Sequence, residues 1–308
     1  MGAEQKAPIK EQLSDQLPKR FRALQFGVQS HQEIVNQGVL EVSDNLLYDV
    51  ENGRRTFPHG PLDPRLGTSS KTGTCETCNL PLQSCAGHFG HVRLPLPVFH
   101  IGYLKYIQAT LQNICKTCSK VLLEEEPKAK FLKALRAPGI DNLKRSAILK
   151  KINDECRKQK TCPYCGDTQG VIRKLSVMKL THDKFSHFNK STAQKKIPPV
   201  SKAAFDSSFI QAKTFTPDLE KHSKKAMDDM DPLKVLKLFK KITAEDCELL
   251  GLNPSEGRPE MFLWQYLPAP PICIRPSVQQ EAASNEDDIT SKLSEIILYA
   301  GHLRDSLL

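Results

Sequence analysis

The sequence lacks several features that would each point to a particular class of protein. None of its apolar stretches approaches the roughly 20 residues that a membrane-spanning helix needs. The N-terminal segment MGAEQKAPIKEQLSDQLPKR has no apolar core of the kind that marks a secretory signal. The nucleotide-binding patterns GxxxxGK(S/T) and GxGxxG are also absent. We therefore expect no membrane partner, a location in the cytosol or nucleus, and no glycine loop of these two kinds.

The formal net charge of +9 is unevenly distributed along the 308 residues. Residues 171–205 hold eight lysines or arginines against one aspartate, whereas residues 281–308 hold two basic against six acidic residues. A basic region of this kind is typical of proteins that contact phosphate backbones. A solvated, lysine-rich loop would have the same composition, so the charge alone leaves both interpretations open.

Ten cysteines stand out in a chain without a secretory signal, because their thiols are expected to stay reduced and to bind metal. In the segment CETCNLPLQSCAGHFGH, Cys75, Cys78, Cys85 and His88 form two pairs, each separated by two residues. This spacing is typical of a structural zinc site with four Cys or His ligands. His91 is the competing fourth ligand. We favour His88 because it keeps the same spacing in both pairs.

A second set consists of two CxxC pairs, Cys115 with Cys118 and Cys162 with Cys165, separated by 43 residues. Two expected helices in this interval can bring the pairs together at small entropic cost. Cys156 could replace one member, but it has no CxxC partner. Four protein ligands leave no open position for water, so both sites would stabilise structure rather than catalyse hydrolysis. The uneven spacing of the pairs disfavours a cross-braced, RING-type ubiquitin ligase.

The fold class expected from the pattern of apolar and turn residues is α+β, with mixed helices and short strands in a loop-rich chain around two structural zinc sites. The predicted elements are a strand through Leu24 and Phe26, a helix after Ser30, a strand near 39–42, an irregular segment at 60–69, a strand at 92–96, a helix through 101–111, helices at 125–137 and 142–157, a helix beginning at Asp231–Pro232, a short helix between Thr243 and Gly251, and an extended segment at 266–278. Residues 183–226 have no firm period and are expected to be the least ordered. Cys247 and Cys273 are expected to be small buried residues.

The predicted helix at 142–157 has two unlike faces. Leu143, Ala147, Ile148 and Ile152 form the apolar face. The opposite face carries the candidate nucleic-acid contacts, which are Lys144, Arg145, Lys150 and Lys151.

Several segments resemble the N-terminal clamp region of the largest subunit of multisubunit DNA-directed RNA polymerases. They are DPRLGTS, CETCNLPLQSCAGHFGHVRLPLPVFHIGY, ICKTCSKVLL and LPAPPICIRPSV. Three further segments are most similar to the RNA polymerase III branch of that family, namely LRAPGIDNLKRSAILKKINDECRKQKTCPYCG, LKLFKKITAEDCELLG and NEDDITSKLSEII. The resemblance runs from about Arg20 to Ile297 in the same order of motifs. The final residues LYAGHLRDSLL do not resemble the family, which suggests a truncated or partial chain.

The resemblance implies that both Cys-rich sets bind structural zinc in a clamp that closes over DNA and the RNA–DNA hybrid. It also implies a nuclear location, other RNA polymerase III subunits as partners, and a part in the synthesis of small RNAs such as 5S rRNA and tRNA. The expected divisions are a flexible N-terminus (1–19), a part of the clamp core with the first zinc site (20–114), a helical clamp head with the second zinc site and a basic, partly mobile stretch (115–230), a return to the clamp core through the proline-rich segment (231–297), and an atypical tail (298–308).

The family's catalytic aspartate loop, NADFDGD, is absent from the sequence. We therefore expect no catalytic residue here. Nucleotidyltransferase activity and its Mg²⁺ would belong to the complete polymerase, and the chain alone would be inactive. The alternative is a free-standing zinc-binding adaptor that recognises nucleic acid or a transcription complex without belonging to an enzyme. A downstream continuation that contains NADFDGD would decide for the polymerase.

Overall fold

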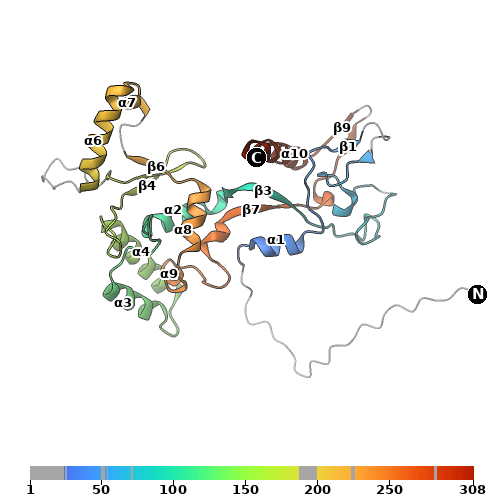
Figure 1. Ribbon diagram of the computed structural model, residues 1–308. Helices are drawn as coiled ribbons and strands as arrows, with labels where there is room; N and C mark the ends of the chain where they lie inside the picture. The colour runs from blue at the N-terminus through green and yellow to red at the C-terminus, as the bar shows by residue number, and fades with distance from the viewer. Residues whose placement is uncertain are drawn as a thin grey trace, which may run out of the picture.

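A two-stranded ribbon connects two groups of elements in the computed structural model, in which residues 24, 26–49, 53, 55–70, 72–186, 200–222, 226–280 and 283–308 are described. The ribbon consists of β3 (Gly90–Phe99) and β7 (Leu263–Ala269), paired antiparallel. Figure 1 shows it crossing the middle of the molecule, with most helices at one end and short hairpins at the other. The predicted flexible N-terminus, residues 1–19, lies outside the described residues.

Prolines shape this ribbon. The pairing is regular up to Arg93 and shifts before Val98. Pro95 and Pro97 lie in the shifted interval and have no N–H to donate to a ladder. Because the ribbon has only two strands and the one described bridge to the outer edge of β3 lies at His91, the prolines face an unpaired edge that tolerates their missing donors. The expectation that segment 266–278 is extended, and not a central strand, is confirmed for its first residues, which belong to β7.

The larger apolar core lies at the helical end. Its helices are α2 (Leu104–Asn113), α3 (Glu125–Leu135), α4 (Asn142–Lys158), α8 (Pro232–Lys240) and α9 (Ala244–Leu249), preceded or followed by the 3-10 turns Ile101–Tyr103 and Pro259–Phe262. Fully buried side chains such as Ile107, Leu111 and Phe239 share one cluster with Cys115 and Cys162. The second Cys-rich set is therefore part of this core.

A small antiparallel sheet extends the helical end. Its strands are β4 (Val171–Lys174), β5 (Leu180–Asp183) and β6 (Met227–Asp229), in that order. Figure 1 shows α6 (Val200–Phe215) and α7 (Leu219–His222) projecting beyond this sheet.

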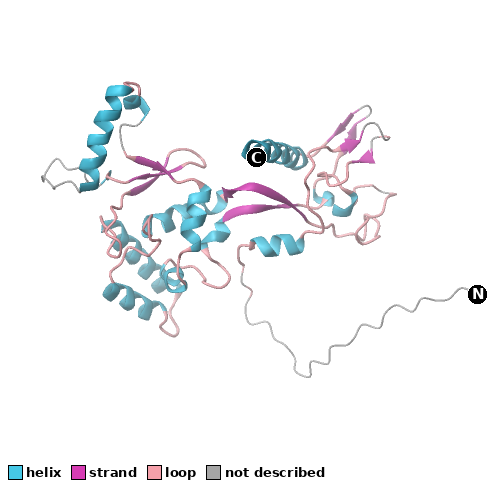
Figure 2. Cartoon of the chain, viewed as in Figure 1, coloured by secondary structure: helices cyan, strands magenta, loops and turns pink. Residues whose placement is uncertain are grey.

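The smaller core lies at the other end of the ribbon and includes Val42, Leu66, Val92 and Ile297. The elements around it are α1 (His31–Gln37), the pair β1 (Tyr48–Asp49) and β2 (Arg55–Thr56), the 3-10 turns Pro64–Leu66 and Ile272–Ile274, the pair β8 (Val278–Gln280) and β9 (Ala283–Asn285), and α10 (Asp288–Leu307). Figure 2 shows that long loops connect the short strands here. One of these loops carries the first Cys-rich set.

Two helices begin at the residues where the sequence predicted their starts. Ser30 Oγ accepts a hydrogen bond from the N–H of Glu33, and the Glu33 carboxylate accepts one from the N–H of Ser30, which completes a capping box for α1. Asp231 caps α8 with its side chain, and Pro232 takes the first helical position. Both predictions are confirmed.

The cap of α9 is only half of a capping box. Thr243 accepts a hydrogen bond from the N–H of Asp246. The Asp246 carboxylate is buried and instead forms an ion pair with Lys128 of α3, at 2.9 Å. Gly251, with φ of 76°, follows the helix end as expected. The ion pair joins α3 to α9, a contact that helix-cap rules alone do not reveal.

Two predicted strands near the N-terminus are wrong or reduced. Leu24 and Phe26 lie outside any strand, and their side chains are exposed. The strand expected near 39–42 is reduced to a single parallel bridge between Glu41 and His91. Neither segment has a partner strand along its length among the described residues, and an isolated extended segment gains little stability.

The low order expected for 183–226 is wrong for residues 200–215, which form α6. None of its side chains is fully buried, but Phe205 stacks on Phe209 one turn later, with ring centroids 6.0 Å apart. Phe185 contacts the same pair at 6.0 Å from Phe205. None of the described helices is both long enough and apolar enough to cross a membrane.

Candidate metal centres

Three of the four ligand pairs lie in the same kind of small hairpin. In each, the N–H of the first cysteine donates to the carbonyl five residues later. The residues flanking each hairpin form an antiparallel bridge, namely Thr74 to Pro81, Ile114 to Val121 and Thr161 to Thr168. The residue after the second cysteine has a positive φ, of 56° at Asn79, 64° at Ser119 and 71° at Gly166. This left-handed residue reverses the chain, so that both thiols of a pair face the same point.

The Cys85–His88 pair is built differently. The N–H of Cys85 donates to Pro81 and that of His88 donates to Leu66. Gly87 between them has φ of 82°, and a Cβ there would lie 2.5 Å from the Pro271 side chain. Only glycine fits this close approach.

The first set comprises Cys75, Cys78, Cys85 and His88, whose ligand atoms all lie within 4.8 Å of one another. Cys85 Sγ is 3.8 Å from His88 Nε2. Zinc at about 2.3 Å from sulfur and about 2.0 Å from nitrogen places neighbouring ligand atoms of a tetrahedron roughly 3.6 to 3.8 Å apart. These donors therefore fit one zinc ion.

The second set brings together two hairpins that are far apart in the sequence. Cys115 Sγ lies 3.5 Å from Cys165 Sγ, and Cys118 Sγ lies 3.6 Å from Cys162 Sγ. All four sulfurs lie within 4.8 Å of one another. These separations are too long for a disulfide, at about 2.05 Å, and close to the sulfur–sulfur edge of a zinc tetrahedron. The 43 residues between the pairs hold α3 and α4, and α4 packs against α2 and α3. This packing brings the two ends of the intervening segment together.

The two competing ligands lie outside both sets. His91 is on β3, where its ring meets the edge of Tyr266 at 5.8 Å between centroids. Cys156 is on α4 in the apolar core, and burial raises the pKa of its thiol to about 12. Cys247 is buried as expected, whereas Cys273 is only half-buried and approaches the loop of the first set through Ala86.

Hydrogen-bond donors surround the thiol of Cys115. The N–H of Thr117 lies 3.4 Å from its Sγ, and the side-chain amide of Gln169 lies 3.2 Å away. Burial raises the pKa of this thiol, but hydrogen bonds from the backbone N–H groups of Cys118 and Thr117 and from the neighbouring thiols outweigh that effect and hold the pKa below its ordinary value. Burial instead raises the pKa of Cys118 to about 12. Cys115 therefore loses its proton more readily than Cys118.

Gln169 is a residue that the sequence analysis missed. It is almost fully buried and also accepts a hydrogen bond from the N–H of Lys116. The signal that could have found it is its place four residues after Cys165, at the end of the last hairpin. A side chain in that position can reach back to the sulfurs, as metal sites commonly require of their supporting residues.

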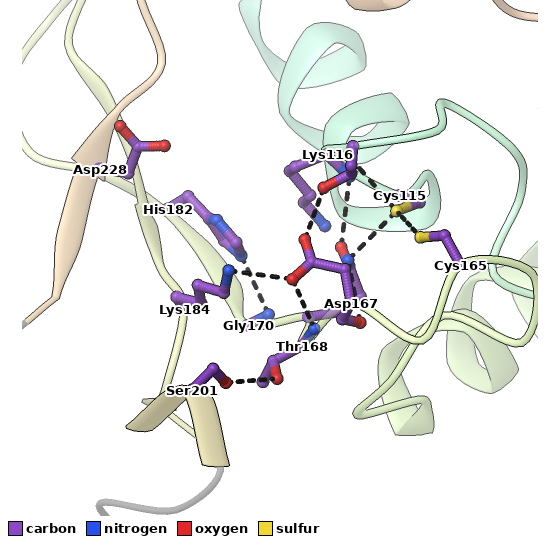
Figure 3. Close-up of polar contacts among 12 residues, drawn as sticks. Cys115, Lys116, Cys165, Asp167, Thr168, Gly170, His182, Lys184, Ser201 and Asp228 are labelled. Atoms are coloured by element: carbon purple, nitrogen blue, oxygen red, sulfur yellow. Dashed lines mark hydrogen bonds and ion pairs between the residues drawn. The ribbon is translucent and has the colours of Figure 1, made fainter. Parts of the chain in front are cut away.

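A partly buried polar network adjoins the second set (Figure 3). Lys184 forms an ion pair with Asp167 at 2.9 Å, and the hydroxyl of Thr117 donates to the same carboxylate. His182 Nε2 accepts from the N–H of Gly170 at 3.0 Å. Burial lowers the pKa of His182 to about 3, so this imidazole is neutral at physiological pH.

The basic residues predicted on α4 are all exposed. These residues are Lys144, Arg145, Lys150 and Lys151. The apolar face predicted opposite them is correct only in part, because Leu143 is 80% exposed and Ala147 is also exposed. Ile152 and Cys156 anchor the second half of the helix. Ile148 and Leu149 pack against the larger core, so only the residues up to Ala147 stand free of it.

The chain matches a known family along almost its whole length. The family described as RNA polymerase Rpb1, domain 1, matches residues 18–307. This overturns the expectation that the resemblance stops after Ile297 and that residues 298–308 form an atypical tail. The structure agrees with the match, because α10 runs without interruption to Leu307.

Curated relatives include the DNA-directed RNA polymerase III subunit rpc1 of Schizosaccharomyces pombe, which is 49% identical over 97% of this chain. The corresponding subunit RPC1 of Saccharomyces cerevisiae is 47% identical over 94% of the chain, and that of Homo sapiens is 39% identical over 94%. The chain spans 20–21% of the length of these relatives. The two Cys-rich sets, the β3–β7 ribbon that connects the two cores and this extent of similarity lead to one conclusion: the chain belongs to the family of RNA polymerase Rpb1, domain 1.

Proposed function

We propose that the chain is the N-terminal clamp part of the largest subunit of a nuclear DNA-directed RNA polymerase III. The observation that carries this proposal is the 39–49% identity to RNA polymerase III subunits over 94–97% of the chain. The complete polymerase would supply the Mg²⁺-dependent synthesis of small RNAs such as 5S rRNA and tRNA. The chain itself would contribute the shape of the clamp and its contacts with nucleic acid and with other subunits.

Each Cys-rich set would bind one structural zinc ion. The spacing of the donor atoms, the left-handed residues of the hairpins and the N–H groups directed at sulfur support this assignment. The proposed ligands are Cys75, Cys78, Cys85 and His88 at the first site, and Cys115, Cys118, Cys162 and Cys165 at the second. The first ion would fasten the loop that packs on the smaller core, and the second would join the ends of the helical insertion to the larger core.

The exposed basic side of α4 would contact DNA or the RNA–DNA hybrid. Its side chains Lys144, Arg145, Lys150 and Lys151 would neutralise phosphates without reading bases. Two observations support this proposal. All four side chains are exposed, and no described carboxylate lies within ion-pair distance of any of them. Such contacts position a duplex and make its binding sensitive to salt.

A chimeric polymerase tests the proposed function. The segment of the Schizosaccharomyces pombe subunit that aligns with this chain would be replaced by it, in cells that have no other copy. We expect growth, with 5S rRNA and tRNA precursors made at near-normal levels. A matched chimera with both Cys75→Ser and Cys162→Ser should fail, because each site would lose a thiolate.

Two outcomes of this experiment would contradict the proposal. A stable chimeric subunit that assembles with the other subunits but makes no small RNA would show that the chain cannot act as this clamp. A chain that does not assemble, but binds nucleic acid alone, would favour the free-standing zinc-binding adaptor.

A further inference from the structure

Lys116 occupies an unusual position for a lysine. It lies between two proposed ligands, Cys115 and Cys118, yet its side chain is only 9% exposed. It is the one buried lysine among the described residues. The corresponding residues of the other three pairs, Glu76, Ala86 and Pro163, are all exposed. Something at this one hairpin therefore favours a buried cation.

The ammonium of Lys116 has no local partner. In the described part of the chain, its Nζ makes no hydrogen bond and no ion pair. Figure 3 shows its side chain lying beside Cys115 and directed toward Asp167. The Asp167 carboxylate, however, already pairs with Lys184 and accepts from Thr117.

The other groups around Lys116 leave the thiolates as its main source of compensation. His182 is neutral and contributes no negative charge, since burial lowers its pKa to about 3. The acidic groups near enough to act on the ammonium of Lys116 are Cys115, Cys156, Asp167 and Cys162. Cys156 has a raised thiol pKa and stays protonated. The ligand sulfurs and a shared carboxylate therefore remain.

Charge balance explains why an ammonium would be kept here. Four thiolates around a divalent ion leave two negative charges, whereas three thiolates and a neutral imidazole leave one. A buried, uncompensated charge is costly in the low-dielectric interior. The second site carries the larger charge and lies within the larger core, and it is the site that has a buried cation.

We propose that Lys116 is the charge-balancing residue of the second metal centre, holding the tetrathiolate site together through its buried, otherwise unpaired ammonium. This inference rests on the proposed function, in that the second set binds zinc. It assigns to Lys116 a positioning role toward the thiolates and no direct bond to the metal.

Zinc release from the 308-residue chain tests this role. The chain would be loaded with Zn²⁺ and challenged with the chromogenic chelator 4-(2-pyridylazo)resorcinol, with the Cys75→Ser variant used to identify the phase that belongs to the second site. Lys116→Met keeps the aliphatic stem and removes the charge. We expect it to release the second ion about 10- to 100-fold faster and to leave the first ion unaffected.

Lys120→Met is the matched control. Lys120 lies in the same hairpin but is exposed, with its Nζ 4.4 Å from the centroid of the Tyr164 ring. Solvent screens this charge, so its removal should change the release rate by no more than about twofold. Equal effects of Lys116→Met and Lys120→Met would overturn the proposal.

A double-mutant cycle separates charge balance from packing. Cys165→His lowers the negative charge of the site by one at its exposed ligand. The effect of Lys116→Met should shrink several-fold in that background, because neighbouring charges couple. An effect of unchanged size would mean that Lys116 only fills space, which overturns the proposal. Loss of the effect in Asp167→Asn but not in Cys165→His would assign the ammonium to the carboxylate and would overturn it as well.

Folding and metal content keep the outcomes distinct. If Lys116→Met does not fold, Lys116→Arg, which keeps the charge, should restore zinc binding, and failure of both variants would contradict a role in charge. Absence of zinc from the second site of the parent chain would instead refute the metal assignment on which the inference rests.

Discussion

At the scale of single residues, the ligand thiolates and a buried arginine carry the largest expected effects. Each proposed zinc site has four ligands, so that removing one thiolate opens a corner of the tetrahedron. Because the two sets share no residue, their losses should be independent.

We expect two zinc ions per folded chain and one after either single substitution. Cys75→Ser should remove the first ion and Cys162→Ser the second. Elemental analysis of chelator-washed protein measures both changes, and Cys247→Ser, at a buried cysteine outside the sets, is the control. Iron in place of zinc, or loss of both ions from one substitution, would contradict the assignment of two separate zinc sites.

Arg275 should be important for stability. Its side chain is completely buried and donates to the carbonyls of Pro61 and Pro270 and to the hydroxyl of Thr290 on α10. Arg275→Met would leave these acceptors without a donor, at about 1–3 kcal/mol for each buried group.

The expected result for Arg275→Met is a loss of about 3 kcal/mol or more in the free energy of unfolding, measured with denaturant. Arg304→Met is the control. Arg304 lies on α10, the helix that Arg275 contacts, but its side chain is exposed. Equal stabilities of the two variants would show that the buried guanidinium does not fasten α10 to the smaller core.

At the scale of elements, α4 combines a side anchored in the larger core by Ile152 and Cys156 with an exposed basic side. A helix of this kind can present cations to a partner without a change in the core. Lys150 and Lys151 are exposed and stand next in the chain to the buried Ile152.

Replacing Lys150 and Lys151 with Ala should weaken duplex binding about equally on unrelated sequences. The slope of log affinity against log salt should fall by up to about two, since two phosphate contacts are lost. Filter binding at several salt concentrations measures both quantities. Lys130→Ala with Lys133→Ala on neighbouring α3 removes the same charge and serves as the control.

Unchanged affinity and slope in the α4 variant would place the DNA contact elsewhere, and the lysine-rich stretch 173–202 would be the next segment to test. A loss confined to one DNA sequence would also contradict the proposal, because phosphate contacts carry no sequence information.

At the scale of the whole molecule, the two proposed zinc sites belong to different ends of the molecule. The first set adjoins the smaller core, and Cys115 and Cys162 of the second belong to the larger one. The β3–β7 ribbon connects these cores (Figure 1). Metal loss should therefore loosen two separate regions and leave the ribbon paired.

Removal of zinc by a chelator at neutral pH should open the chain to proteases first within 64–88 and 159–170. The same opening should appear as pH falls, because protons compete with the metal for the thiolates. Limited proteolysis followed by mass spectrometry measures the order of cleavage, with the zinc-loaded chain as control. Cleavage that begins within β3 or β7 would mean that the ribbon, and not the metal loops, is the less stable part.

Much of the candidate site could be predicted from the sequence because its chemistry is local. A CxxC pair sets two thiols on one turn, and Ser30 or Asp231 caps a helix through contacts within a few residues. The strand at 92–96 and the helices at 125–137 and 142–157 were predicted from periodicity for the same reason. The choice between His88 and His91 also followed the local spacing that the donor geometry favours.

The sequence by itself thus determined which residues form the two Cys-rich groups, most helix starts and the family. The tertiary structure alone decided which surfaces stay exposed and which polar groups are buried. Leu143 has helical apolar spacing but extends past the core, and α6 forms without a buried face. The burial of Lys116 and Arg275 depends on segments that are distant in the chain. Local rules describe neighbours within a few residues, whereas burial is set by packing between elements, and no spacing rule encodes that packing.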